Sequence, residues 1–228
     1  MPAGAILFIA AIFAAVIVGI VVSFQAAKKR RLAMEAWATE RDWHYTADNV
    51  SSFDRRFAHL GCFTQGDNRY GYNIVRGEQE GCDLWALDYH YETYSTDSKG
   101  NRQTHHHHFS AVVVDTGMVL QSLSLRKEGI FDKMKGAFGF DDIDFESAEF
   151  SREFWVTAKE KRWAYDVINQ RNMELLLKSP RFSLQFEGTH VVAWRSRRFK
   201  PLEFDQALKL VFGVLEGIPK DIRERLRN

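Results

Sequence analysis

The sequence is poor in cysteine and proline and has no charged side chain before Lys28. Four prolines among 228 residues, together with 14% aromatic residues, argue against wholesale disorder and favour a real core. Cys62 and Cys82, the only cysteines, are interpreted as two small buried hydrophobic side chains. The net charge of +1 gives no global attraction for nucleic acid, so no nucleic-acid partner is expected.

Several sequence motifs of common enzymes are also missing. The chain contains no GxxxxGK[ST] loop, no GxGxxG between a strand and a helix, no HExxH and no GxSxG. These absences count against the common ATPases, dehydrogenases, zinc proteases and hydrolases. They favour a protein that is not an enzyme, although they do not exclude an enzyme of an unfamiliar class.

A long apolar run dominates the N-terminal part. The 22 residues from Ala3 to Phe24 carry no charge, and Lys28, Lys29, Arg30 and Arg31 follow. About 20 apolar residues in a helix span the roughly 30 Å hydrocarbon core of a bilayer. A signal peptide would carry its positive charges before a shorter run, so a transmembrane helix is the better interpretation.

The four cations also predict orientation and a membrane contact. The positive-inside rule places the N-terminus outside and the remaining chain in the cytoplasm, where both cysteines are expected to be reduced. If that domain instead faced an oxidising space, the two would form a candidate disulfide. We expect Lys28, Lys29, Arg30 and Arg31 to lie at the membrane surface, beside anionic headgroups.

The sequence divides into three parts. Residues 1–27 form the transmembrane helix, 28–45 a basic juxtamembrane segment with a linking helix, and 46–228 a soluble domain. In the linking helix, Leu32, Ala33, Ala36 and Trp37 are expected to share the packed face. In the span, small residues recur every fourth position, a spacing that allows self-association through Ala11, Ala15 and Gly19.

The first half of the domain has the alternation of an antiparallel sheet. Strands are predicted at 60–64, 70–76, 82–94, 105–115 and 118–125, with turns at 66–68, 77–81 and 97–101. In the long hairpin of 82–94 and 105–115, a period of two places Trp85, Leu87, Tyr89, Phe109 and Val113 on one buried face.

The second half mixes helices and strands. The sequence predicts a weak helix at 132–139, an acidic run of Asp141, Asp142, Asp144 and Glu146, a strand at 154–161 and a helix at 164–178. A hairpin of 182–186 and 191–194 turns at Gly188, and a last helix begins at Pro201 with an apolar stripe of Phe204, Leu208, Val211, Phe212 and Leu215. Strands in runs with helices between them predict one α+β domain with a mainly antiparallel sheet.

This plan resembles a class of uncharacterised bacterial single-span membrane proteins with a C-terminal α+β domain of unknown function. The residues that carry the resemblance are Trp43-His44-Tyr45, Asp88-Tyr89-His90-Tyr91, and Asp144-Phe145-Glu146-Ser147 with Phe150. The resemblance covers most of the chain and implies no activity, cofactor or substrate.

One group of residues could bind a metal. If the hairpin loop centres on Lys99, His90 faces His108 and Glu92 faces His106, and all four side chains lie on the face opposite Trp85 and Tyr89. Imidazole and carboxylate groups at this spacing are able to share a zinc ion. The alternative is a solvated strand end that carries histidines without a function.

Two functions follow from these features. The first is a membrane-tethered cytoplasmic binding or scaffold module, whose partners are the lipid bilayer and an unidentified protein, with no cofactor. The alternative is a metal-dependent hydrolase that uses His90, Glu92, His106 and His108 with zinc.

Overall fold

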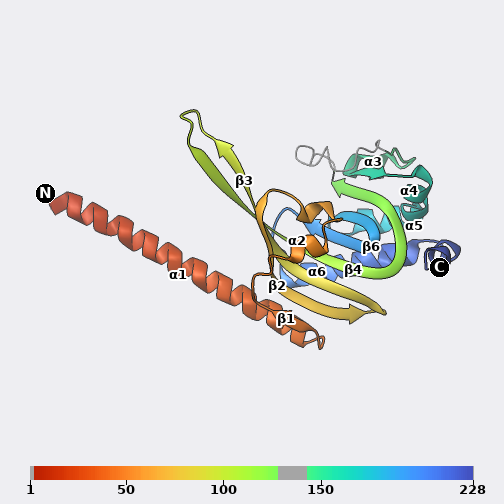
Figure 1. Cartoon of the computed structure of the whole chain (residues 1–228), viewed down its shortest axis with the longest axis horizontal. Coiled ribbons are helices and arrows are strands. Elements are labelled where there is room, and N and C mark those ends of the chain that lie inside the picture. The colour runs from red at the N-terminus through yellow and green to blue at the C-terminus, as the bar shows by residue number, and fades with distance from the viewer. Residues whose placement is uncertain (1–2, 128–142, 228) are drawn as a thin grey trace.

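The computed structural model describes residues 3–127 and 143–227, without the side chains of 3–7 and 10. Helix α1 (Ala3–Thr39) is continuous and projects from the domain (Figure 1). It is long and apolar enough to cross a membrane, and its most apolar window has no residue buried in the domain. The predicted boundary at residue 27 falls inside this one helix. The weak helix at 132–139 and the acidic residues Asp141 and Asp142 lie outside the described residues.

The last turns of α1 pack on the domain as predicted, but the packed face is shifted, and Trp37 alone of the four predicted residues is buried. Met34, Trp37 and Ala38 are buried, whereas Leu32 is 56% exposed and Ala36 is exposed. The Trp37 indole N–H donates to Asp205 at 3.0 Å and so orients the helix against α6 (Pro201–Gly217). The buried residues of this helix occupy positions i, i+3 and i+4 counted from Met34, and therefore lie on one face.

Within the described residues the sheet has six antiparallel strands, which confirms the α+β class. They are β1 (His44–Thr46), β2 (Asp67–Gln79), β3 (Cys82–Thr96), β4 (Arg102–Lys127), β5 (Phe154–Ala158) and β6 (Ser183–Arg195). The order is β1-β2-β3-β4-β5, and β6 also pairs with β4. Strand β4 therefore has β3 and then β5 along one edge and β6 along the other, and it curves through the whole domain (Figure 1).

Two glycines bend the sheet at the same place, and they account for two wrong predictions. Gly117 in β4 and Gly188 in β6 both have φ +62°, and Leu120 pairs with Gly188 between two shifts of register. The predicted strands 105–115 and 118–125 are therefore one bent strand. Segments 182–186 and 191–194 are likewise two halves of β6, and not a hairpin. A glycine that marks a bulge gives the same sequence signal as one that marks a turn.

A short helical segment covers one face of the sheet. It comprises α2 (Phe53–Arg56) and the 3-10 turn η1 (Gly61–Phe63), which replaces the predicted strand at 60–64. Its buried aromatic residues pack on the face of Trp85, Tyr89, Phe109 and Val113. The Tyr89 hydroxyl donates to the Phe63 carbonyl at 2.7 Å, which fixes the segment on the strand.

The other face carries the larger core, so both faces of β3 and β4 are buried in the body of the domain. This core lies under α3 (Ala148–Glu153), α4 (Lys161–Val167), α5 (Gln170–Lys178), α6, α7 (Lys220–Leu226) and the end of α1. The predicted helix at 164–178 is two helices, because Asn169 caps α5 by accepting from the Asn172 N–H. The predicted apolar stripe of α6 is buried throughout.

Candidate functional site

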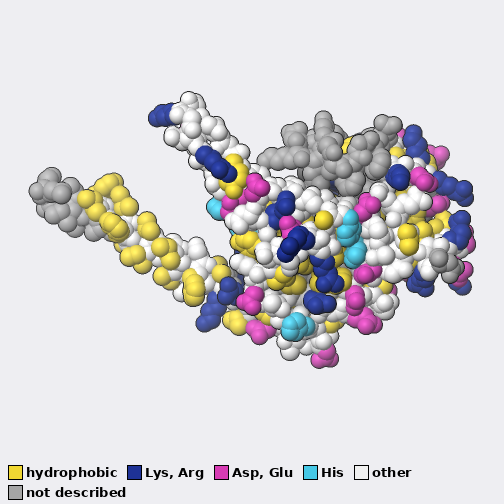
Figure 2. All heavy atoms as spheres, in the orientation of Figure 1, with side chains coloured by type: hydrophobic (Ala, Val, Ile, Leu, Met, Phe, Trp, Pro, Cys, Tyr) yellow, Lys and Arg dark blue, Asp and Glu magenta, His cyan; other side chains and the backbone are white. Residues whose placement is uncertain are grey.

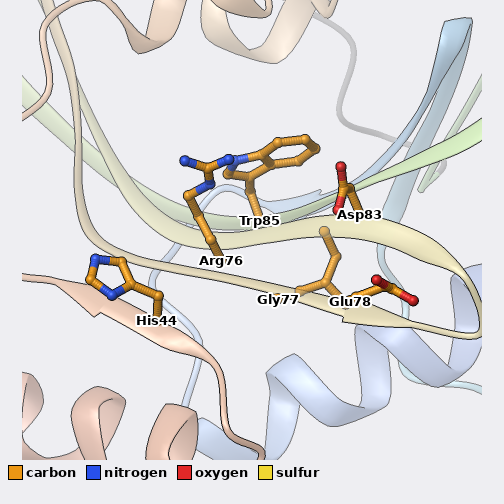
Figure 3. Close-up of a pocket in the computed structure, with 7 residues that line it drawn as sticks. His44, Arg76, Gly77, Glu78, Asp83 and Trp85 are labelled. Carbon is orange, nitrogen blue, oxygen red and sulfur yellow. The ribbon is translucent and has the colours of Figure 1, made fainter.

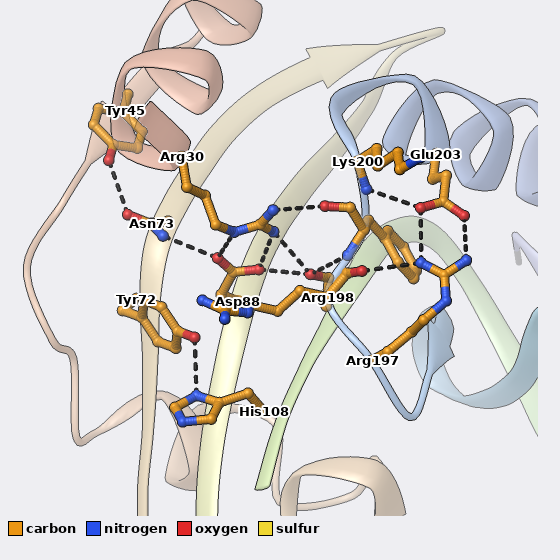
Figure 4. A network of polar contacts seen from close by, with 12 residues as sticks. Arg30, Tyr45, Tyr72, Asn73, Asp88, His108, Arg197, Arg198, Lys200 and Glu203 are labelled. Atoms are coloured by element: carbon orange, nitrogen blue, oxygen red, sulfur yellow. Dashed lines mark hydrogen bonds and ion pairs between the residues drawn. The ribbon is translucent and has the colours of Figure 1, made fainter. Parts of the chain in front are cut away.

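The membrane helix is joined to the sheet by a buried ion pair. Asp88 on β3 is fully buried, and Arg30 on α1 holds it with both arms of its guanidinium, with Nε 2.6 Å from Asp88 Oδ2 (Figure 4). Ser110 on β4 and Asn73 on β2 donate to the two carboxylate oxygens at 2.5 and 2.9 Å. Each of the two carboxylate oxygens thus accepts two hydrogen bonds. These bonds offset much of the free-energy cost of removing the charge from water.

The same guanidinium reaches the loop between β6 and α6. Its Nη1 donates to the Phe199 carbonyl at 2.6 Å, and the Phe199 N–H donates to Ser110 Oγ at 2.9 Å. Arg30 therefore connects α1 directly to β3, β4 and this loop, and through Asp88 to β2. We call these contacts around Arg30 and Asp88 the joint.

The joint changes the interpretation of the basic cluster. Arg30 was predicted to lie at the membrane surface, yet its side chain is only 17% exposed and points into the domain. Lys28, Lys29 and Arg31 are exposed, and basic side chains gather where the apolar part of α1 meets the domain (Figure 2). Their contact with headgroups stays a prediction.

A second ion cluster fixes the loop that carries Phe199. Glu203, at the start of α6, accepts from Arg195 at 2.6 Å, from Arg197 at 2.6 and 2.9 Å and from the Lys200 N–H at 2.8 Å (Figure 4). These bonds, above all those from Arg197, lower the pKa of Glu203 to about 2. The single negative charge of Glu203 therefore offsets one of the two positive charges of Arg195 and Arg197.

Further along the same hairpin face lie the predicted metal ligands. His90 pairs with His108 and Glu92 with His106, as the loop-centre argument predicted. One ligand atom from each of His90, Glu92 and His106 lies within 4.8 Å of the others, and we call these three residues the His–Glu cluster. His90 is buried, Glu92 is 9% exposed, and His106 is exposed. A hydrogen bond from Asn68 lowers the pKa of Glu92.

His108 does not join this cluster. Its Nδ1 lies 3.0 Å from the hydroxyl of Tyr72 on β2, although its ring centroid is 4.8 Å from that of His90 (Figure 4). Burial lowers the pKa of His108 and raises that of Tyr72 to about 12. Both groups are therefore neutral at pH 7, and the Tyr72 hydroxyl occupies one ring nitrogen of this predicted metal ligand.

The residues predicted for self-association lie on the free part of α1. Ala11, Ala15 and Gly19 are exposed, and no atom lies within 4 Å of a Cβ built at Gly19. Their face is thus open to another helix, and self-association stays a prediction.

The sequence reasoning missed a third polar group beside the bend of β6. His59 Nε2 lies 3.1 Å from His190 Nδ1, and His190 Nε2 lies 3.7 Å from Asp115. Burial lowers the pKa of both histidines. These residues come from three distant parts of the chain, so no local spacing indicated them.

Hollows lined by described residues also lie away from these groups, and the two largest of them have mixed linings. One, of about 380 Å³, is at the opposite end of β3 from Tyr94–Thr96, and Figure 3 shows Arg76 beside Trp85 there. The guanidinium groups of Arg56 and Arg76 lie 4.7 and 5.7 Å from the Trp85 ring centroid. The other, of about 680 Å³, is an open groove beside α5 and α6. Both basic and acidic side chains line each hollow, so neither hollow favours an anionic over a cationic ligand. The first is lined by His44, Arg76, Gly77, Glu78, Asp83, Leu84 and Trp85.

Comparison with known proteins identifies a similar fold. No known family model matches the chain, and no curated protein is similar to it in sequence. Among solved structures, the crystal structure of the mycobacterial trehalose monomycolate transport factor A, TtfA, is similar with a TM-score of 0.63. The match covers 83% of this chain and 96% of that chain at 13% identity. At this identity the likeness shows the fold alone, and it agrees with the expected membrane protein with a sheet domain.

Proposed function

We propose that this chain is a membrane-anchored accessory protein, without catalytic activity, that holds a binding domain at the cytoplasmic surface and there contacts an integral membrane protein of a transport system. The joint carries this proposal. Because α1 runs without a break into the domain and Arg30 binds the buried Asp88, the domain has a fixed position on its span. A flexible tether would serve localisation equally well, so a rigid one favours a positioned contact.

The likeness to TtfA supports the choice of partner. That protein's name describes a transport factor, and its fold matches over 96% of its length. A shared fold does not by itself carry a function. It makes membrane transport the first system in which to seek the partner. The hollows described above do not include the His–Glu cluster, so the hydrolase alternative gains no support from them.

The contact surface that we propose is the hairpin arm, residues 93–105. The arm continues β3 and β4 beyond the body of the domain and projects from the same end as α1 (Figure 1). Its tip is polar, and Ser95, Ser98 and Gln103 are exposed. Such a tip is too polar to enter hydrocarbon, so it suits the polar loops of a membrane protein beside the span.

Site-specific photo-crosslinking in native membranes tests this function. A photoreactive residue at Ser98 should give a covalent adduct with an integral membrane protein. The same residue at Tyr165, which is 50% exposed on α4, serves as the matched control. Replacing residues 94–104 with Asn-Gly joins Thr93 to His105, which are already paired, and should leave a folded domain that no longer recruits that protein.

The outcomes separate clearly. An adduct at Ser98 with a protein of a transport system, absent at Tyr165 and not recruited by the shortened hairpin, supports the proposal. The proposal fails if both positions give the same adducts, or if Ser98 captures only soluble proteins or nothing.

A further inference from the structure

The three ligand atoms of the His–Glu cluster have the spacing of a zinc site. His90 Nε2 and Glu92 Oε1 each lie 3.2 Å from His106 Nδ1, and they lie 4.0 Å from each other. In a tetrahedral site with bonds of about 2.0–2.1 Å, neighbouring ligand atoms are about 3.3 Å apart. Two of the three separations already match this value, and the third requires a small closing movement of the Glu92 carboxylate.

Hydrogen-bond partners on β2 and β3 hold these ligands in the orientation that a metal needs. The Asn68 carbonyl lies 3.0 Å from His90 Nδ1. Because a carbonyl oxygen only accepts, His90 carries its proton on Nδ1 and directs the lone pair of Nε2 into the cluster. The Asn68 amide donates to Glu92 Oε1 at 2.7 Å, and the Tyr94 hydroxyl donates to Oε2 at 3.2 Å. Such outer contacts fix the tautomer and rotamer of metal ligands.

We propose that His90, Glu92 and His106 bind a zinc ion, with a water molecule in the fourth position. Two imidazoles and one carboxylate suit zinc, whereas calcium and magnesium prefer ligand sets made of oxygen alone. The zinc ion takes the place of the proton on His106 Nδ1, and the neutral ring then carries its proton on Nε2. The fourth position faces solvent on the side of His106, whose side chain is 59% exposed.

The site lies where the hairpin loses the support of the domain. In β3 the residues from Leu84 to His90 are buried and so is Glu92, whereas the last three, from Tyr94 to Thr96, are exposed. An isolated two-stranded hairpin is only marginally stable in water. A metal that joins His106 on β4 to His90 and Glu92 on β3 cross-links the strands at this point and therefore stiffens the hairpin arm.

Zinc titration of the full-length protein in detergent micelles, after treatment with a chelator, tests the site. The parent should bind one zinc ion by calorimetry and unfold at a higher temperature with zinc than without. Cobalt in place of zinc should give the intense visible bands of a tetrahedral ion. His106→Ala changes an exposed side chain and should lower the affinity at least about tenfold. Asn68→Ala, which leaves all three ligands in place, should also weaken zinc binding by about tenfold or more.

Three other histidine variants serve as controls. His105 and His107 point to the opposite face, where they contact Ser95 and Thr93, and His108 contacts Tyr72. His105→Ala, His107→Ala and His108→Ala should each keep the affinity within about threefold of the parent, well below the loss expected on removing a ligand. Equal losses in all four histidine variants would mean adventitious binding by the histidine run. That result, or a parent with no zinc-dependent shift, overturns the proposal.

Discussion

Asp88 carries its carboxylate at a position without solvent access, so its contribution to stability depends on the groups that donate to it. Of its donors among the described residues, Arg30 carries a positive charge, whereas Ser110 and Asn73 are neutral. Removal of one partner from a buried ion pair leaves an uncompensated charge, which costs more than the pair contributes.

We therefore expect Arg30→Met to lower the free energy of unfolding by about 3–5 kcal/mol. The double variant Arg30→Met with Asp88→Asn should lose less than the sum of the two single losses, because it leaves no buried charge. Urea unfolding in detergent, followed by tryptophan fluorescence, measures both. Arg31→Met, at an exposed neighbouring position, should change stability by less than about 0.5 kcal/mol. An Arg30 variant as stable as the Arg31 variant would mean that the joint does not hold the domain.

At this scale the sequence predicted which residues face each other but not where each side chain points. The pairs His90–His108 and Glu92–His106 followed from a loop centred on Lys99. The contact of His108 with Tyr72 depends on β2, where the register shifts between Tyr72 and Val75. Arg30 could not be distinguished from its three basic neighbours, because its partner is 58 residues away.

Among the elements, α6 shows how one carboxylate can make the stability of the fold depend on pH. In the folded chain the pKa of Glu203 is about 2, below its ordinary value of 4.5. As pH falls, the unfolded chain takes up this proton first, so protonation favours unfolding. The stabilisation from Glu203 is complete above about pH 5 and is lost as pH falls towards 2.

Thermal unfolding from pH 7 to pH 2.5 should show this loss. The parent should be more stable than Glu203→Gln at pH 7, and the difference should shrink as pH falls below about 5. Glu216→Gln, which changes an exposed carboxylate on the same helix, should run parallel to the parent. A constant difference between parent and Glu203→Gln across the whole range would show that the ion cluster does not stabilise the fold.

The elements that the sequence predicted well are those whose apolar residues recur with one clear period, as in a helix or a strand. The stripe of α6 and the long hairpin have such a period, and both were found. Segment 53–63 has apolar residues without strand alternation, and it forms short helical turns that cap the sheet. The strand-like alternation of the sequence stops at Gly117 and at Gly188, but strands β4 and β6 continue through these residues. The two strands bend together there.

For the molecule as a whole, orientation in the membrane is the next property to establish. The positive-inside rule predicts that residues 32–228 are cytoplasmic. Protease added to intact cells should therefore leave a C-terminal tag untouched, and permeabilised cells should lose it. Reversal of the charges at Lys28, Lys29 and Arg31, with Arg30 kept for the joint, should weaken this bias. Digestion of the tag in intact cells would place the domain outside.

The unbroken α1 has one more consequence, which concerns bilayer thickness. A span that is longer than the local hydrocarbon layer tilts to fit it. Since α1 enters the domain as one helix and Arg30 fixes it to Asp88, the domain rotates with that tilt. A thinner bilayer then swings the domain on its helix and changes the height of the hairpin tip above the headgroups. We therefore expect lipid composition to change the height of the arm without any ligand.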